Sequence, residues 1–490
     1  MKNIFKLRFI AAFIILILSG SCTKDFIKIN TNPNSPTSVP ASNVLGQGII
    51  STAGSLFNTK MDLYYAGSYS GMSASLGAGN GDYEFRVDIN NSWWSRLYSC
   101  MNDFVSADSL ASKEGNTILE AVALTMKAYT AQTTTDMFGA IPYSEAFETS
   151  KGIIYPKYDS QQDVYKAILS ELKTAADIFN NGQGEIGEGD FIFHGDVSKW
   201  RKFCNSIRLR AAMRISNVDP ETAKSVVTEI LGNPANYPVM ASNDDNAYLY
   251  YPGGSFKDLW NSDSQVGNET WGWYRLNDVL ISTLKMFNDP RLPVYALPNI
   301  WGIYNGYKFG PAQRSDTMNN SNNLSRIGDR FANDPQGFSP FMNCAEVYFM
   351  LAEAYERNLA SGDAQEAYEN GIKASMEENG VNTSGINQFL AEPGIAWNTG
   401  TTSNLDKIYL QEWVSLFKHS LEAWCVARRT DVPLMTNISQ DYAGKHNRPP
   451  FRFPYPNSEI TLNVHFPKDV NSVDIFWGDQ LWWDTRKNVH

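Results

Sequence analysis

Aromatic side chains in segments rich in Gly and Asn are the residues of this sequence best suited to binding chemistry. Three groups of rings stand in such segments rather than in helical patterns: Trp271, Trp273 and Tyr274; Trp301, Tyr304 and Tyr307; and Tyr69 with Tyr83. A flat ring packs against the C–H face of a sugar, while neighbouring amides and carboxylates hydrogen-bond its hydroxyls. The alternative for each ring is that it fixes a long loop to the scaffold. We predict that these groups supply the ligand-binding site.

Patterns for covalent catalysis do not appear in the sequence. There is no nucleophile motif, phosphate-binding loop or metal-ligand spacing, and the 5 His residues are scattered. A pair of carboxylates for glycoside hydrolysis is recognised by its separation in space, so the sequence does not exclude one. We predict binding without catalysis, with no cofactor and no metal ligand.

The position of Cys22 indicates a covalent modification. Basic residues precede an apolar run from Phe9 to Leu18, and small residues Ser19–Ser21 follow it, which is the pattern of a secretory signal. The run is too short to span a bilayer, which takes roughly 20 residues. A cysteine directly after such a signal is the residue that bacterial lipoproteins acylate, and acyl chains give a durable anchor. We predict that residues 1–21 are removed and that Cys22 is lipidated; the alternative is a chance cysteine behind an ordinary signal peptide.

Composition narrows the class of partner. The formal net charge is −11, so nucleic acid is not an expected partner. The cysteines other than Cys22 are Cys100, Cys204, Cys344 and Cys425. No two are close in sequence and three lie on apolar helix faces, which predicts buried thiols rather than disulfides.

The elements that position these residues are expected to be helices, because helical periodicity dominates the sequence. Capping residues followed by apolar positions at helical spacing predict helices from Asn116, after Asp159, from Ser198, from Asn343 with Glu346, from Asp363 with Glu366, and from Asn404 through Trp424. The short Ser361-Gly362 turn makes two of these helices antiparallel neighbours.

The helix pairs predict a mainly α fold with a degenerate tetratricopeptide-like helical-repeat scaffold and loop-rich insertions. We expect a polar extended tether over 22–40 and a single domain over 41–490. Within it, helical repeats cover about 100–220 and 340–430. Between them, over about 233–340, periodicity gives way to Gly, Pro, Asn and aromatic residues, and we expect the ligand-binding insertion there.

Sequence phrases in a fixed order also carry a family resemblance that runs nearly end to end. They include CTKDFIKINTNPNSPT from Cys22, DMFGAIPYSEAF from Asp136, HGDVSKWRKFCNSIRLRAAMRIS from His194, AEVYFMLAEAY from Ala345, QEWVSLF from Gln411, EAWCVARRTDVP from Glu422 and RFPYPNSEITLN from Arg452. In these phrases the chain resembles the SusD/RagB family of nutrient-binding outer-membrane lipoproteins, in its SusD-like branch.

The resemblance implies a lipid-anchored protein on the outer membrane, exposed at the cell surface and partnered with a TonB-dependent (SusC-like) transporter. Such proteins act as a hinged lid on top of the transporter and pass glycans or peptides into it. We favour a glycan ligand; a peptide ligand, or a periplasmic helical-repeat scaffold without a small ligand, are the alternatives. For most motif residues, among them Trp200 and Arg210, we expect a structural role in tying a helix to its neighbours. Arg428 and Arg429 could meet a ligand carboxylate, but near a helix carboxyl terminus we favour internal partners for them.

Overall fold

A computed structural model shows how the chain folds and describes residues 39–76, 87–267, 272–310, 319–436, 438, 444–468 and 477–490. The predicted signal peptide, Cys22 and the tether up to residue 38 lie outside the described residues, as do two of the predicted ligand-binding rings, Trp271 and Tyr83. Residues Ala41–His490 group into one unit. Over the described ranges, no helix is both long and apolar enough to cross a membrane.

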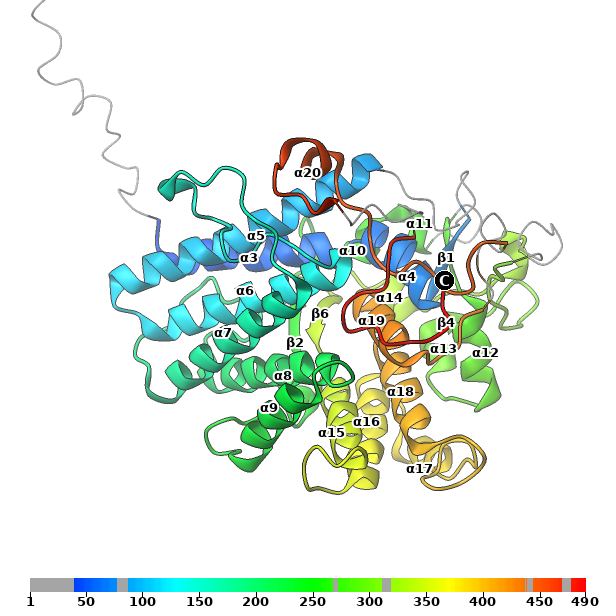
Figure 1. The fold of residues 1–490 in the computed structure, drawn as a ribbon. Coiled ribbons are helices and arrows are strands. Elements are labelled where there is room, and N and C mark those ends of the chain that lie inside the picture. The colour runs from blue at the N-terminus through cyan, green and yellow to red at the C-terminus, as the bar shows by residue number, and fades with distance from the viewer. Residues whose placement is uncertain are drawn as a thin grey trace, which may run out of the picture. The chain divides into compact units, whose positions relative to one another are not determined.

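Helices packed side by side form the amino-terminal part of this unit (Figure 1). Each packs on the next along the chain, and α3 packs on α5. Their bounds are α3 Ala41–Leu56, α5 Val87–Glu114, α6 Thr117–Phe138, α7 Gln161–Asn181, α8 Val197–Ile215 and α9 Pro220–Gly232. Between α3 and α5 lie a π-helical turn η1 (Lys60–Tyr65), α4 (Ala66–Ser70) and β1 (Ser73–Ser75), and the 3-10 turn η2 (Thr149–Lys151) precedes α7.

A second set of helices continues the scaffold. Helix α15 packs on both α16 and α18, α18 packs on α19, and α8 meets α15, which joins the two sets. The bounds are α15 Cys344–Glu356, α16 Ala364–Glu378, α17 Thr383–Leu390, α18 Asn404–Ser415, α19 Ser420–Thr430 and, near the carboxyl end, α20 Asn457–Leu462. The predicted mainly α fold built from helix pairs is confirmed.

Short elements occupy the segment between the two sets. They are η3 (Asn243–Asp245), α10 (Leu259–Ser262), α11 (Ser264–Gly267), α12 (Asp278–Met286), α13 (Leu292–Tyr295), η4 (Ser321–Asn323) and α14 (Asp329–Ala332). Two-stranded antiparallel sheets connect them: β1 with β3 (Tyr274–Leu276), β2 (Ala247–Tyr250) with β6 (Phe338–Met342), and β4 (Ala296–Leu297) with β5 (Arg326–Ile327). The sequence analysis did not predict these strands, because each is five residues or fewer and shows little alternation.

Side-chain caps explain where the predicted helices begin. The side chains of Asn116, Asn343 and Asp363 accept the N–H groups of Leu119, Glu346 and Glu366, so these three predicted helix starts are confirmed. The predicted start after Asp159 is also confirmed, because α7 begins at Gln161 behind its cap Ser160. Helix α8 begins at Val197, one residue before the predicted Ser198, and is capped by Asp196. For α18 the cap is Ser403, and Asn404 is the first helical residue.

The prediction of one helix from Asn404 through Trp424 is wrong, because this segment forms two helices, α18 and α19. Lys418, between α18 and α19, adopts a positive φ of 72°, and its buried ammonium donates to Asp258 at 2.7 Å. Helix α19 then begins at Ser420, whose N–H donates to the carboxylate of Asp62 at 2.7 Å. Partners far away in sequence therefore set this break.

Buried ion pairs cross between helices of the scaffold. The Arg210 guanidinium of α8 donates to Glu346 of α15 at 2.6 Å and 2.8 Å, and Arg214 pairs with Glu422 of α19. Arg429 of α19 pairs with Glu353 of α15 at 2.6 Å through both terminal nitrogens. The predicted internal partners of Arg210 and Arg429 are thus confirmed. Cys100, Cys204, Cys344 and Cys425 are buried free thiols, as predicted.

Asp62 makes the stability of the protein depend on pH. Burial raises the pKa of its carboxyl group from 3.8 to about 7, so the folded state holds this proton more tightly than the unfolded state does. The stabilisation from the bound proton is complete below pH 3.8 and is lost as pH rises through about 7, by on the order of 4 kcal/mol. We expect Asp62→Asn, which retains an acceptor for Ser420, to gain stability relative to the native protein between pH 5 and pH 8.

Chemical denaturation at the two pH values measures this difference. The exposed Asp244 provides a matched control, and Asp244→Asn should leave the difference between the two pH values unchanged. An Asp62→Asn variant that follows the native pH profile would contradict the assignment.

Candidate ligand-binding site

Trp273 presents an exposed ring beside a small sheet. Its indole is 53% exposed, and its backbone carbonyl accepts the N–H of Leu76 at 2.6 Å, just beyond the pairing of β1 with β3. The next residue, Tyr274, belongs to β3 and is buried in the core around α12. Successive side chains of a strand point to opposite faces, so Trp273 and Tyr274 separate. Tyr274 lacks the exposed surface that the prediction assumed.

Trp301 is the second exposed indole of the predicted site. It is 60% exposed and sits in a tight turn that Asn299 organises, because the Asn299 side-chain oxygen accepts the N–H groups of Trp301 and Ile303, both at 3.0 Å. The Asn299 N–H donates to the carbonyl of Ile303 at 2.9 Å and closes the turn. These hydrogen bonds hold the backbone that carries the Trp301 ring in one conformation in the absence of ligand.

The other two rings of that group turn inward. Tyr304 is half-buried against the core around α12, and its carbonyl accepts the ammonium of Lys285 at 3.1 Å. Tyr307 is buried in a small cluster with Ala74, Phe309 and Leu324, so it too lacks the surface that the prediction assumed.

Tyr69 lies in the core and not in a loop. The glycines around it suggested a loop, but the residue belongs to α4, which ends at Gly71 in the left-handed conformation. Its buried ring packs 5.2 Å from Trp424 and 5.8 Å from Phe453, measured between ring centroids. These neighbours come from the far end of the chain, so the local sequence did not reveal them.

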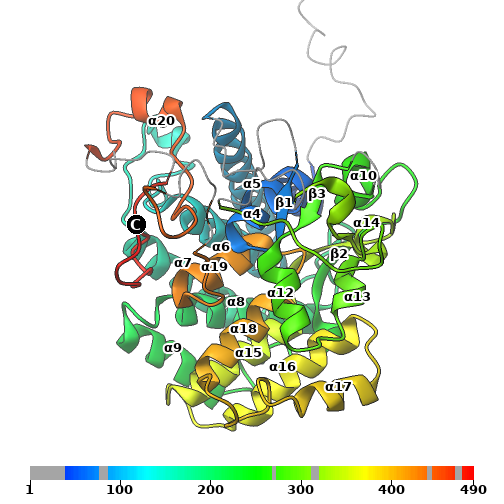
Figure 2. The ribbon, with the colours of Figure 1, turned by 90° about the vertical axis from the view of Figure 1, so that its right-hand side faces the viewer.

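The structure brings the 273–274 and 301–307 groups to one region around β3 and α12. The Tyr307 N–H donates to the Leu276 carbonyl at 2.8 Å, and the Asp278 N–H donates to the Tyr307 carbonyl at 2.9 Å. The elements β1, β3 and α12 lie near one another in Figure 2. The candidate site is therefore defined by the rings of these two groups that keep exposed surface, Trp273 and Trp301, together with the half-buried Tyr304.

The sequence analysis did not select other exposed rings of the described residues, among them Tyr250 and Phe256. Tyr250, at the end of β2, is 60% exposed with its centroid 6.0 Å from that of Phe338, and Phe256 is partly exposed beside Tyr251. Tyr250 follows the buried Tyr248 by two residues in β2, so the residue spacing alone did not reveal its exposure.

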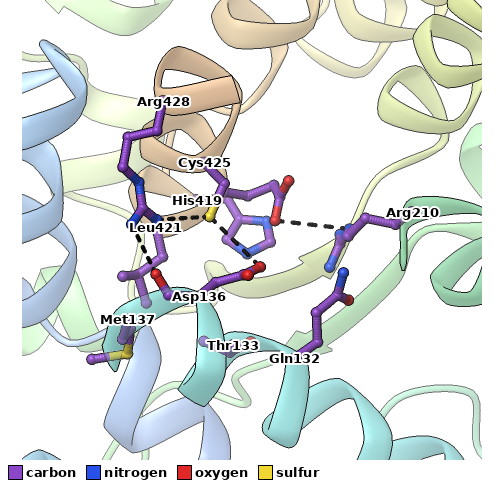
Figure 3. A pocket seen from close by; sticks show the side chains of 10 residues that line it. Gln132, Thr133, Asp136, Met137, Arg210, His419, Leu421, Cys425 and Arg428 are labelled. Atoms are coloured by element: carbon purple, nitrogen blue, oxygen red, sulfur yellow. Dashed lines mark hydrogen bonds and ion pairs between the residues drawn. The ribbon is translucent and has the colours of Figure 1, made fainter. Parts of the chain in front are cut away.

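Asp136, His419 and Cys425, which are residue types found in active sites, line a buried polar cavity (Figure 3). Its volume is about 10 Å³, which is room for roughly one water molecule. Burial lowers the pKa of His419 to about 3 and raises the pKa of Cys425 to about 12. Neither a neutral thiol nor an unprotonated imidazole in so small a space provides an accessible nucleophile. The cavity is part of the scaffold interior.

These groups also hold one another. Arg428 donates to the Asp136 carbonyl at 2.8 Å and to the Cys425 sulfur at 3.1 Å, which confirms internal partners for Arg428. Asp136 also accepts the Tyr165 hydroxyl and the Trp483 indole N–H at 2.7 Å and 2.8 Å. Among the described residues, no group of three or more His, Cys, Asp or Glu side chains is placed to hold a metal ion.

Comparison with known proteins supports one family. No curated protein matches the sequence. A SusD-like protein from Bacteroides thetaiotaomicron is 25% identical, with a TM-score of 0.77, and the match covers 92% of this chain and 100% of that one. A chitin-binding SusD homologue from Flavobacterium johnsoniae is 25% identical, with a TM-score of 0.75 over 90% of this chain and 99% of that one. Another solved chitin-binding protein is 26% identical, with a TM-score of 0.77 over 91% and 100%.

The match to a family model covers most of the sequence. The model is described as starch-binding and associating with the outer membrane, and it matches residues 33–456. Together with the solved structures, this match confirms the resemblance seen in the sequence phrases. The chain belongs to the SusD-like family of binding proteins that associate with the outer membrane.

Proposed function

We propose that this chain is a lipid-anchored protein of the cell surface that binds an oligo- or polysaccharide and delivers it to a TonB-dependent outer-membrane transporter. The observation that carries the sugar-binding part is the exposure of Trp273 and Trp301 on anchored backbone. Indole faces suit the C–H faces of sugars, and an indole that is already exposed can make this contact without displacing the core.

The relatives support a polysaccharide as the ligand. Two solved proteins with this fold are named as chitin-binding, and the family model is described as starch-binding. Both polymers consist of sugar rings with an apolar face, which is the surface that an exposed indole recognises. Direct titration of the mature protein with starch, chitin and pectic oligosaccharides, and with peptides of similar mass, tests the proposal. Binding to peptides alone would contradict it.

Delivery to a transporter and anchoring rest on the family and on Cys22. The family associates with the outer membrane, and Cys22 follows a signal-type sequence with a polar tether behind it. In this arrangement the tether holds the domain at the membrane while the helical repeats face the transporter. Protease added to intact cells should cleave the protein while a cytosolic control stays whole; protection of both would contradict surface exposure.

Cys22→Ala tests the anchor itself. Without the thiol there is no acylation, so we expect the variant to leave the outer-membrane fraction while its domain folds normally. Membrane fractionation and mass spectrometry of the amino-terminal peptide measure the two effects. Thr23→Ala is the matched control and should stay in the membrane with an acylated cysteine. A Cys22→Ala protein that remains in the outer membrane like the native protein would contradict lipidation.

A further inference from the structure

Arg275 is a buried cation with unused hydrogen-bond donors. It lies in β3 and has no exposed surface. One terminal nitrogen, Nη1, donates to the carbonyls of Gly272 and Tyr274 at 2.9 Å and 2.8 Å. Its Nε and Nη2 groups have no hydrogen-bond partner among the described residues. A buried donor without an acceptor is costly, and a buried charge without a counter-charge is more so.

The other buried arginines of the scaffold show what Arg275 lacks. Arg210 faces Glu346, Arg429 faces Glu353, and Arg291 faces Asp289 at 2.6 Å. Within the part of the chain that the structure describes, Arg275 has no ion pair with a carboxylate. Burial and then the neighbouring cation Arg326 lower the pKa of Arg275 to about 10. Its surroundings therefore disfavour the positive charge, and a bound anion would offset this unfavourable energy.

The position of Arg275 connects it with the candidate site. Strand alternation places Tyr274 and Leu276 toward the core around α12 and leaves Trp273 and Arg275 on the opposite face. Because Nη1 bonds to the Gly272 carbonyl, the guanidinium lies back along the backbone that carries the exposed Trp273. The residue paired with Arg275 across the sheet is Ala74, whose side chain is a single methyl group. The exposed ring of Trp273, which directly precedes β3, and the unused guanidinium donors of Arg275 in β3 thus come from positions two residues apart.

We propose that Arg275 receives the carboxylate of an acidic sugar whose ring packs on Trp273, so that the ligand is a uronate-containing glycan. This inference rests on the proposed sugar-binding function and adds its chemical class. A guanidinium presents parallel N–H donors that match the two oxygens of a carboxylate. A neutral sugar would leave the buried charge unpaired, whereas a uronate supplies both the counter-charge and the acceptors.

Binding at Arg275 includes a local rearrangement, because the guanidinium is covered in this structure. Association that waits for such a change is slower than simple docking. The arrangement also predicts an unusual relation between stability and binding. A buried, unpaired charge lowers stability, so an apolar residue of similar length at this position should not lower it further, although it removes uronate recognition.

Arg275→Met tests the proposal in the full mature protein. The probes are oligosaccharides that contain galacturonate or glucuronate and the same oligosaccharides after reduction of their carboxyl groups. We expect the native protein to prefer an acidic form by about tenfold or more, as a charge-assisted hydrogen bond provides. Arg275→Met should lose that preference, keep its affinity for the reduced form, and unfold at no lower temperature than the native protein. Arg96→Gln removes one exposed positive charge elsewhere and should behave like the native protein.

Three results would overturn the inference. The first is equal affinity of the native protein for acidic and reduced oligosaccharides, which leaves sugar binding itself intact. The second is an Arg275→Met protein that keeps the acidic preference. The third is a variant that unfolds at a clearly lower temperature and loses affinity for both forms alike, because Arg275 would then be a structural residue. Failure of the proposed function is separate, since it would appear as binding of peptides and of no sugar in the wider panel.

Discussion

Replacing Trp273 and Trp301 together by alanine is expected to weaken glycan binding by a factor of 100 or more, on the order of 3–4 kcal/mol for two central aromatic residues. Both indoles are more than half exposed, so their removal takes away ligand contacts and little of the core. The far-ultraviolet circular dichroism should therefore remain that of the native helical protein. Titration calorimetry with the best glycan from the binding panel measures the loss.

Controls for this experiment come from rings elsewhere. Tyr155 is exposed to a similar degree outside the candidate site, and Tyr155→Ala should leave affinity unchanged. Tyr250→Ala asks whether the ring that the sequence analysis missed contributes. If the double tryptophan variant binds as tightly as the native protein, the surface around β3 and the 299–303 turn is not the binding site.

Removing the Glu353 carboxylate is expected to destabilise the protein by about 3–5 kcal/mol, the usual cost of leaving a buried charge without its partner. Glu353 is fully buried and accepts Arg429 at 2.6 Å through each oxygen, Arg357 at 2.7 Å and the Tyr409 hydroxyl at 3.1 Å. Glu353→Gln replaces the anion with a neutral amide and leaves two guanidinium groups without their counter-charge. Urea denaturation at pH 7 measures the loss.

The direction of the pH dependence supports the same assignment. Burial acts to raise the pKa of Glu353, but the Arg429 and Arg357 guanidinium groups outweigh it and hold the pKa below its usual value of 4.5. The ion pair therefore stabilises the fold above pH 4.5 and is lost as pH falls below that value. Glu377→Gln on neighbouring α16 is an exposed control and should change stability by less than about 0.5 kcal/mol. A Glu353→Gln protein as stable as this control would show that the pair contributes little.

The sequence predicted those features that local chemistry determines. Asn116, Asn343 and Asp363 cap helices because a side-chain oxygen reaches an N–H three residues away, and that relation is visible in the sequence. Trp273 and Trp301 were correctly expected to be exposed, since Gly and Asn surround them and no helical pattern requires them.

Features that depend on residues far away in the sequence could not be predicted from local sequence patterns. Tyr69 is buried by Trp424 and Phe453, more than 350 positions away in the sequence. The break before α19 depends on Asp62 and Asp258, and no local signal announces either. The sequence did not single out Arg275, because only its burial and its unused donors distinguish it.

The paired charges between α8, α15 and α19 have a consequence for how such proteins diverge. Changing Glu346 without Arg210, or Glu353 without Arg429, passes through an intermediate that folds poorly, so we expect lineages to inherit these partners together or replace them together. The other side chains on the Asn299 turn have no partner among the described residues that must change with them, because backbone groups and the Asn299 amide hold the turn. Under the proposed function, exchanging the rings on that turn would change the ligand that is bound while the helical frame stays the same.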